Sequence, residues 1–136
     1  MLLDDNGEDM GLLKDALVES RRFAVPAICA SYELLRHALG DLDAAPDAVV
    51  CDIYMEKKDG VAVCKELQED GRYAGTAFFL IKGAAPQPSL VRGAYQYSVR
   101  AVFLKPYSAA GYASLAMQLA SILEKGGAAS PLLITP

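Results

Sequence analysis

Several residue types and motifs that would point to particular chemistries are scarce or absent in this chain. His37 is its single histidine, so the sequence holds no Ser–His–Asp or Cys–His arrangement, and hydrolytic triads are excluded. We expect His37 to be an exposed helix residue. The GxGxxG and P-loop motifs are also missing, which argues against nucleotide binding.

Cysteine is scarce as well. Cys29, Cys51 and Cys64 are scattered, with no CxxC pair and no cluster of cysteine with histidine. This spacing favours neither a disulfide framework nor a zinc site. We interpret the three cysteines as small buried apolar side chains.

Long apolar runs and basic charge are lacking too. No stretch approaches the roughly 18 to 20 apolar residues that a membrane-spanning helix needs. The first ten residues carry acidic side chains where a signal peptide carries basic ones. The net charge of −4 argues against nucleic acid as a direct partner. We therefore expect a cytoplasmic protein that contacts neither membrane nor nucleic acid directly.

What the chain does have is an alternation of apolar strand-like runs with segments of helical periodicity. The expected strands are Met1–Leu3, Phe23–Cys29, Ala48–Cys51, Thr76–Ile81 and Val99–Leu104. The expected helices are Glu8–Arg21, Tyr32–Leu42, Gly60–Asp70, Pro88–Tyr97 and Ala109–Lys125. This order predicts one α/β domain over residues 1–125, followed by a loose tail or linker stub over residues 126–136.

The third and fourth of these runs are apolar throughout instead of alternating, which is typical of a parallel sheet covered on both faces. The helical segments place apolar side chains at inward spacing, and the inward positions we expect are Met10, Leu13, Leu17, Leu35, Ala38, Leu39, Leu42, Val61, Cys64, Leu67, Leu90, Val91, Ala94, Leu115, Leu119 and Ile122. We also expect Ser31 to cap the second helix.

A proline in the second run bears on the order of the strands. Pro26 has no backbone N–H to donate, so its strand belongs at an edge of the sheet. The flavodoxin-like order 2-1-3-4-5 puts the second strand at an edge, whereas the Rossmann order 3-2-1-4-5-6 puts it inside. We therefore predict a flavodoxin-like (βα)5 three-layer sandwich with a five-stranded parallel sheet.

Charged residues follow four of the five strands. Asp4 and Asp5 follow the first, Asp52 the third, Lys82 the fourth and Lys105 the fifth. The carboxyl ends of parallel strands lie at one edge, and the first and third strands are neighbours in the predicted order. We therefore expect three carboxylates to converge at this edge, with two lysines beside them.

Such a cluster has a physical cost that limits its chemistry. Two carboxylates ~4 Å apart repel by about 4 kcal/mol at an effective dielectric constant of about 20. Either one of them keeps a proton, or a cation binds between them. Oxygen ligands alone favour a hard cation, Mg²⁺ above all. A carboxylate can also accept a phosphoryl group as a nucleophile, with Mg²⁺ and a lysine neutralising the phosphoryl charge.

At this point a family resemblance can be stated. Four short motifs carry it: LLDDN at 2–6, VVCDIYM at 49–55, DG at 59–60 and FLKPY at 103–107. In this order and spacing the sequence resembles the receiver domains of bacterial two-component response regulators. The resemblance covers about residues 1–125, and each motif is weak by itself.

The resemblance implies roles for the acidic residues. Asp52 would be the phosphoacceptor. Asp5 and Asp52 would bind Mg²⁺ directly, and Asp4 would do so through water. The backbone carbonyl of Tyr54 would supply a further ligand.

It also implies roles outside the acids. Lys105 would contact the phosphoryl group and would pair with the acids before phosphorylation. The bond between Lys105 and Pro106 is expected to be cis, and Asp59-Gly60 would shape the turn into the third helix. The phosphoryl donor would be a phosphohistidine on a histidine kinase or a histidine phosphotransfer protein.

Among the departures from the family pattern, two concern its switch residues. Lys82 stands where the family has the Ser or Thr that binds the phosphoryl group, and Val102 stands where it favours an aromatic residue. Lys82 has two interpretations, which the sequence leaves open. Its amine would replace the hydroxyl as a charge-assisted donor, or it is a solvated loop lysine and signalling uses another surface.

The leading functional expectation is a phosphorylation-gated interaction domain, not an enzyme beyond slow self-catalysed phosphorylation and dephosphorylation. Its output surface would be the helix over 88–97, the strand over 99–104 and the helix over 109–125, contacting an output domain or a second copy through Tyr95 or Tyr97. One alternative is a pseudo-receiver that acts as a constitutive docking domain. Another is a Mg²⁺-dependent phosphohydrolase, which Tyr54 disfavours because that chemistry usually needs a second carboxylate there.

Overall fold

The computed structural model describes residues 1–55, 57–83, 89, 92 and 99–125, and the backbone of residues 132–134. Its strands are β1 (Leu2–Leu3), β2 (Ile28–Cys29), β3 (Ala48–Asp52), β4 (Ala77–Lys82), β5 (Val99–Leu104) and β6 (Leu132–Ile134). Its helices are α1 (Gly7–Glu19), α2 (Tyr32–Gly40), α3 (Gly60–Glu69) and α5 (Ala109–Lys125), with a short 3-10 helix at Gly71–Tyr73.

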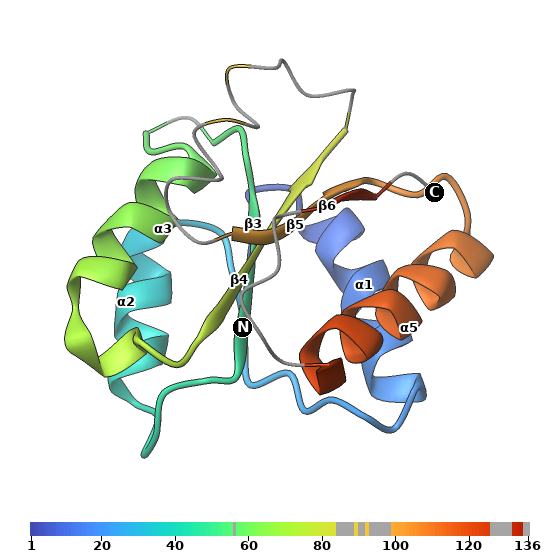
Figure 1. Ribbon diagram of the computed structural model, residues 1–136. Helices are drawn as coiled ribbons and strands as arrows, with labels where there is room; N and C mark the ends of the chain where they lie inside the picture. Colours follow the sequence, from blue (N-terminus) through green and yellow to red (C-terminus); the bar gives the residue numbers. More distant parts are fainter. Residues whose placement is uncertain (56, 84–88, 90–91, 93–98, 126–131, 135–136) are drawn as a thin grey trace.

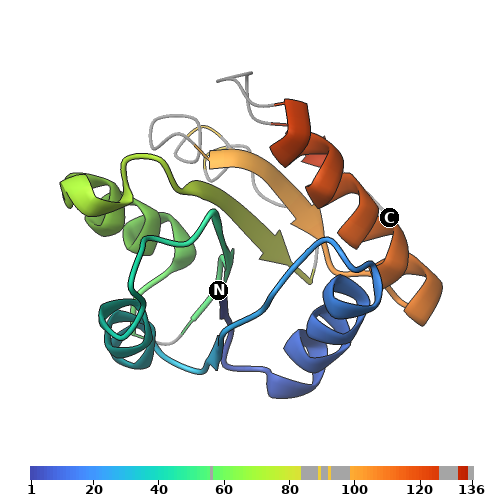
Figure 2. The same cartoon turned by 90° about the horizontal axis from the view of Figure 1, so that it is seen from below.

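All strand pairs are parallel, and the sheet order is β2-β1-β3-β4-β5-β6. In Figures 1 and 2, α2 and α3 cover one face of the sheet, while α1 and α5 cover the other. The predicted three-layer sandwich and the order 2-1-3-4-5 of the first five strands are therefore confirmed.

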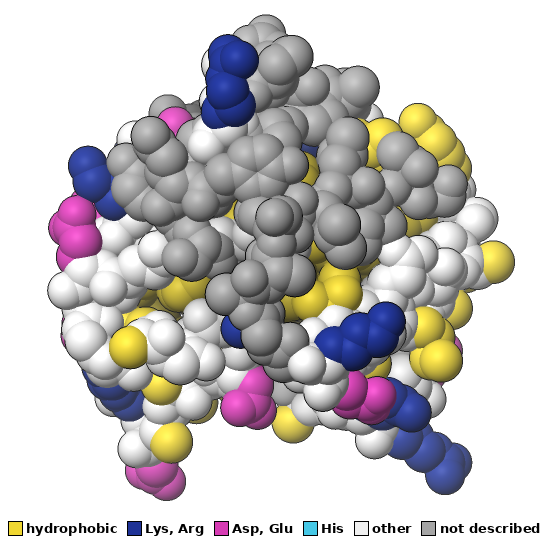
Figure 3. Space-filling model, viewed as in Figure 1, with side chains coloured by type: hydrophobic (Ala, Val, Ile, Leu, Met, Phe, Trp, Pro, Cys, Tyr) yellow, Lys and Arg dark blue, Asp and Glu magenta, His cyan; other side chains and the backbone are white. Residues whose placement is uncertain are grey.

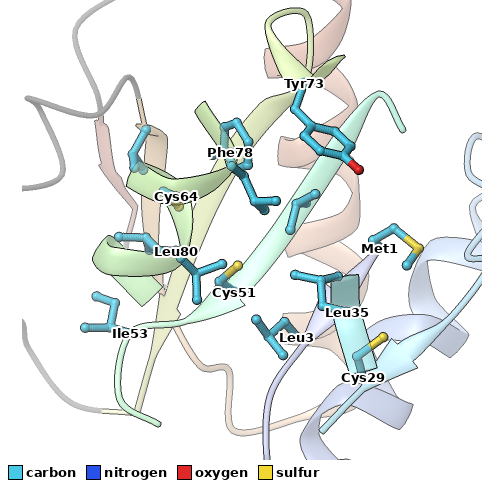
Figure 4. Close-up of a cluster of buried hydrophobic side chains, with 14 of the residues drawn as sticks. Met1, Leu3, Cys29, Leu35, Cys51, Ile53, Cys64, Tyr73, Phe78 and Leu80 are labelled. Carbon is cyan, nitrogen blue, oxygen red and sulfur yellow. The ribbon is translucent and has the colours of Figure 1, made fainter. Parts of the chain in front are cut away.

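The alternation of side chains along β4 divides the core between the two faces. Phe78 and Leu80 pack with α2 and α3, whereas Phe79 and Ile81 pack with α1 and α5. All four are at most 1% exposed, so this strand is apolar on both sides. Figure 4 shows the cluster on the α2 and α3 side, where Leu35 lies against the sheet.

Most of the predicted inward positions are buried. Those fully buried are Met10, Leu13, Leu17, Leu35, Leu39, Cys64, Leu67, Leu115 and Leu119. Those only partly buried against the core are Ala38, Leu42, Val61 and Ile122. His37 is exposed and the three cysteines are free and buried, as predicted. The capping role of Ser31 is also confirmed, since its hydroxyl accepts from the Leu34 N–H at 3.2 Å.

The second strand is shorter than predicted. The sequence suggested Phe23–Cys29, but only Ile28–Cys29 pairs with β1. Pro26 lies just outside the strand, because a residue without an N–H cannot continue the ladder. Phe23 and Val25 instead pack as partly buried residues against the core on the α1 and α5 side. The edge position inferred from Pro26 is nevertheless correct.

The C-terminal part of the chain also differs from expectation. Leu132–Ile134 forms β6, paired in parallel with β5, so these three residues are not the loose tail that we expected. An apolar segment can satisfy the backbone groups at the edge of β5, which explains the pairing. The domain boundary after residue 125 remains a prediction.

Some expectations lie outside the described residues. Of the helix predicted over 88–97, only residues 89 and 92 are described, and both are helical. The inward positions Leu90, Val91 and Ala94 and the two tyrosines proposed for its surface fall in the remainder. Within the described part of the chain, no helix is long and apolar enough to cross a membrane.

Gly60 fixes how closely α3 approaches the end of β3. Its N–H donates to the Ile53 carbonyl at 2.8 Å, and the Asp59 carboxylate caps α3 by accepting from the Ala62 N–H at 2.8 Å. A Cβ atom on Gly60 would lie 2.4 Å from the Asp52 carbonyl oxygen. Only glycine permits this approach, so Asp59-Gly60 shapes the turn beside Asp52.

We predict that Gly60→Ala lowers the free energy of unfolding by about 2 kcal/mol or more, because the added methyl group meets backbone that cannot move away easily. The matched control is Gly11→Ala, within α1, where an added Cβ meets no atom within 4 Å. That variant should be neutral, or more stable by about 0.5–1 kcal/mol. Urea unfolding of both variants tests this, and equal effects would contradict it.

Candidate functional site

Three carboxylates meet at the carboxyl edge of the sheet. Asp52 is the last residue of β3, and Asp4 directly follows β1, whose Leu3 pairs with Cys51. One oxygen atom from each of Asp4, Asp5 and Asp52 lies within 4.8 Å of the others. The structure thus brings together the acids that the strand ends predicted.

Burial makes this cluster electrostatically demanding. Asp4 is 1% exposed and Asp52 7% exposed, while Asp5 faces solvent. Two main-chain N–H groups hold the buried acids: Asn6 donates to Asp4 Oδ1 at 2.9 Å, and Tyr54 donates to Asp52 Oδ1 at 3.1 Å. Each N–H belongs to the residue two positions after the acid, in the loop that follows the strand. The loop backbone therefore fixes one oxygen of each carboxylate.

Lys105 supplies the positive charge at the centre of the cluster. Its Nζ lies 2.9 Å from Asp4 Oδ2, 3.1 Å from Asp9 Oδ2 and 3.7 Å from Asp52 Oδ2. Asp4 Oδ2 is buried and accepts no well-directed hydrogen bond from the described residues, so its contact with Lys105 is an ion pair without hydrogen-bond geometry. Lys105 thus pairs with the acids in this state, as the resemblance implies.

Asp9 is a site residue that the sequence did not reveal. It lies in the first turn of α1, where acidic residues are common because they favour the helix dipole. Its hydrogen bond from Lys105 joins residues 96 positions apart in the chain. One acid at a helix start does not reveal such a contact, so only the tertiary structure identifies it.

The expected cis bond before Pro106 was wrong. The bond between Lys105 and Pro106 is trans, which is the lower-energy form of an X–Pro bond by about 0.5–1 kcal/mol. The trans form already lets the lysine amine reach its carboxylates. Pro106 is buried against the start of α5, where a Cβ on Gly111 would lie 2.6 Å from the Pro106 Cβ.

Proton affinities reflect this crowding. Burial, followed by the neighbouring Asp4 carboxylate, raises the pKa of Asp52 to about 6, against the opposing effects of Lys105 and the Tyr54 N–H. Burial by itself would lower the pKa of Lys105, but the neighbouring carboxylates of Asp4 and Asp9 outweigh burial and raise it. Lys105 therefore stays charged, and Asp52 is the acid whose charge responds near neutral pH.

Lys82 does not behave as a solvated loop lysine. It is the last residue of β4 and only 5% exposed. Its Nζ donates to the Tyr54 hydroxyl at 2.9 Å and lies 4.4 Å from the centre of that ring. The resemblance implies a role only for the Tyr54 carbonyl, so sequence reasoning missed the contact of the Tyr54 side chain with Lys82.

Val102 occupies the position where the family favours an aromatic residue. It is 1% exposed and packs in the core on the α2 and α3 side, opposite Leu80 of β4. The side chain of Val102 is therefore fixed in the core.

The cluster fits a hard divalent cation by its chemistry. All of its donor atoms are oxygens, and one buried carboxylate oxygen lacks a well-directed hydrogen bond from the described residues. Cysteines lie in the core and His37 on the exposed side of α2, so nitrogen and sulfur ligands are not at hand. Any cation would compete with Lys105 for Asp4 and Asp52.

Two cavities lie in the described part of the chain, and the smaller one adjoins the cluster. A cavity of about 300 Å³ adjoins Asp5 and is lined also by Tyr32, Met55 and Lys58. A larger one of about 650 Å³ lies at the amino ends of the strands, near Pro26 and Pro46, away from the acids. Among the described residues visible in Figure 3, the basic and acidic side chains are scattered.

These features define a doubly wound α/β domain, with a parallel sheet between two helical layers. The acidic cluster lies at the carboxyl ends of β1 and β3, which is the topological switch point where the strand order reverses. More narrowly, the chain has the fold of response-regulator receiver domains. It superposes on the non-phosphorylated receiver domain of RcsB from Escherichia coli with a TM-score of 0.76 and 17% identity, over 99% of this chain and 95% of that one.

Two further receiver structures agree. The signal receiver domain of NarL from Mycobacterium tuberculosis matches with a TM-score of 0.67 and 22% identity, over 88% of this chain and 93% of that chain. The phosphorylated cyanobacterial phytochrome response regulator RcpA matches with a TM-score of 0.74 and 18% identity, over 93% and 94%. No protein-family model and no curated protein matches the sequence.

We predict that, without metal, Asp52→Asn is more stable than the wild type at pH 7. The pKa of Asp52 in the fold, about 6, is above its ordinary value of about 3.9, so the folded state holds more protons between these values. Wild-type stability therefore falls as the pH rises through this range. The asparagine variant lacks that loss, which is about 3 kcal/mol at most by order of magnitude.

Urea unfolding in a chelating buffer at pH 4 and pH 7 measures this effect. The advantage of Asp52→Asn should be present at pH 7 and vanish toward pH 4, where the wild-type carboxyl is protonated. Asp43→Asn, at an exposed acid, is the control and should show no such dependence. An advantage of equal size at both pH values would refute the assignment of the raised pKa.

Proposed function

We propose that this chain is a phosphoacceptor receiver domain of a two-component system, which takes a phosphoryl group onto Asp52 and signals through a conformational change. One observation carries the proposal. In a receiver fold, Asp52 stands at the carboxyl edge of β3 beside Asp4, Asp5 and the amine of Lys105. This set supplies a nucleophile, metal-binding acids and a cation for the phosphoryl oxygens.

The two oxygens of Asp52 have different surroundings, which bears on the proposed phosphoryl transfer. Oδ1 accepts the Tyr54 N–H, and Oδ2 faces Lys105. One carboxylate oxygen attacks the phosphorus of a phosphohistidine, the new O–P bond forms as the P–N bond breaks, and the imidazole leaves with the electron pair and takes a proton from water. Lys105 then balances negative charge on the phosphoryl oxygens.

A divalent cation belongs to this proposal. Asp4, Asp5, Asp52 and the Tyr54 backbone carbonyl would hold Mg²⁺, which would neutralise part of the charge on the transferring group. Within the chain itself, Lys105 performs part of that task, because it pairs with the acids when no phosphoryl group is present. The two cations therefore share the acids.

The proposal extends to partners. The donor would be a histidine kinase or a histidine phosphotransfer protein, and the output would reach a linked domain or a second copy through the surface of β5, α5 and residues 88–97. The domain would be cytoplasmic and would turn over no substrate beyond its own slow phosphorylation and dephosphorylation. Direct contact with nucleic acid is not part of the proposal.

A pseudo-receiver is the second candidate. Two observations favour it: Lys105 already engages three carboxylates, and Lys82 and Val102 replace the usual switch residues. A constitutive docking domain would keep the fold and the ion pairs but accept no phosphoryl group. A phosphohydrolase remains disfavoured, since Tyr54 stands where the second carboxylate would be needed.

We predict that incubation with acetyl phosphate and Mg²⁺ adds one phosphoryl group, because the Asp52 side chain, 10% exposed, keeps some contact with solvent at the carboxyl edge of the sheet. Mass spectrometry of the intact protein measures the adduct. Asp52→Asn should remain unmodified, whereas Asp43→Asn, at an exposed acid, should be modified like the wild type. Lys105→Ala should form the adduct about tenfold more slowly or worse, through loss of a charge-assisted contact.

The competing functions give other results. A wild type that stays unmodified with acetyl phosphate and with phosphohistidine donors would support the pseudo-receiver. Rapid consumption of donor over many turnovers would support a phosphohydrolase.

A further inference from the structure

Lys82 is a buried amine held by a residue of the Asp52 loop. It is 5% exposed, and lysine is almost never this buried without a partner. The Lys82 amine donates a hydrogen bond to the Tyr54 hydroxyl at 2.9 Å, and its Nζ lies 4.4 Å from the centre of the Tyr54 ring. Tyr54 itself is 49% exposed, so this contact of the amine lies at the surface.

The same two residues lie next to Asp52. In the β3–β4 register Asp52 pairs with Ile81, and Lys82 is the following residue. Neighbouring strands are about 4.8 Å apart, and the lysine stem is four carbons long, so its amine can reach the group on Asp52. Tyr54 is tied to the same carboxylate through its N–H, 3.1 Å from Asp52 Oδ1.

Phosphorylation would change which partner the Lys82 amine prefers. A phosphoryl group brings a charge of about −1.5 to −2 and three acceptor oxygens, in place of one carboxylate charge. Lys105 already contacts Asp4, Asp9 and Asp52. A hydrogen bond from an ammonium to a charged phosphoryl oxygen is stronger than one to a neutral phenol.

We propose that Tyr54 is a positioning residue for Lys82, and that the Lys82 amine leaves the Tyr54 hydroxyl for a phosphoryl oxygen when Asp52 is phosphorylated. The exchange frees a half-exposed tyrosine on the loop between β3 and α3, and so changes the surface there. Lys82 and Tyr54 together perform the task of the absent hydroxyl and aromatic pair. This inference rests on the proposed phosphorylation of Asp52.

The exchange of partners by Lys82 would also affect the end of β5. The Lys105 N–H donates to the Lys82 carbonyl oxygen at 2.7 Å, so the backbones of the two lysines are bonded to each other. A shift of Lys82 toward Asp52 therefore acts directly on the residue that holds the carboxylates.

The experiment measures binding of beryllofluoride, a phosphoryl mimic, in the presence of Mg²⁺ to the full chain and two variants. Tyr54→Phe removes the hydroxyl that competes for the amine, so beryllofluoride should bind about threefold to tenfold more tightly, the equivalent of one hydrogen bond. Lys82→Met removes the amine, so binding should be about tenfold weaker or worse. Lys82→Arg should keep part of the affinity, since it keeps the charge.

Opposite effects of the two variants distinguish the exchange from a structural role. If the Lys82–Tyr54 contact only supported the fold, both Tyr54→Phe and Lys82→Met would weaken binding. Tyr54 is half-exposed, so its phenylalanine variant should fold, and tighter binding by that variant alone decides the question. Tyr107→Phe, at a tyrosine 93% exposed, is the matched control and should bind like the wild type.

A second readout follows the tyrosine directly. The ring proton signals of Tyr54, assigned by their loss in Tyr54→Phe, should shift in NMR spectra when beryllofluoride binds the wild type and stay in place in Lys82→Met at saturating ligand. Wild-type binding with unchanged Tyr54 signals, or with equal affinity in Tyr54→Phe, overturns this inference and leaves the proposed function standing. A wild type that binds no beryllofluoride and accepts no phosphoryl group overturns both.

Discussion

Mutual repulsion among Asp4, Asp5 and Asp52 is the constraint on which the rest of this structure depends. Two of these acids are buried at the ends of adjacent strands, where water screens them little. Lys105 opposes the repulsion from the end of β5, two strands away from β3. Lys105 therefore offsets part of the repulsion only when β3, β4 and β5 are paired in register, so the acid cluster links local electrostatics to the whole sheet.

The parts of the site that the sequence predicted are those fixed by strand ends. Apolar runs define where β1, β3 and β5 stop, and the parallel arrangement then brings Asp4, Asp52 and Lys105 to one edge. Pro26 placed β2 at an edge by the simple absence of a donor, even though the strand proved to be only two residues long. These inferences need backbone direction and spacing alone, which periodicity supplies.

The parts that escaped prediction depend on where side chains and short segments settle in three dimensions. Asp9 resembles any acid at a helix start, and its role comes from a lysine 96 residues away. Lys82 was open to a solvated reading because most lysines are exposed, and the phenol that accepts its bond is 28 residues away. The pairing of β6 with β5 likewise depends on an available edge, not on a local pattern.

The two lysines at this edge have partners of different charge. Lys105 binds carboxylates, and its raised pKa keeps it charged. Among its contacts, Lys82 donates to the neutral Tyr54 hydroxyl, which is a weaker acceptor than a charged oxygen. Val102 is fixed in the core, whereas Tyr54 is half-exposed and bonded to Asp52 through its backbone. Under the proposed phosphorylation of Asp52, Lys82 and Tyr54 would therefore couple the charge at this residue to the surface of the domain.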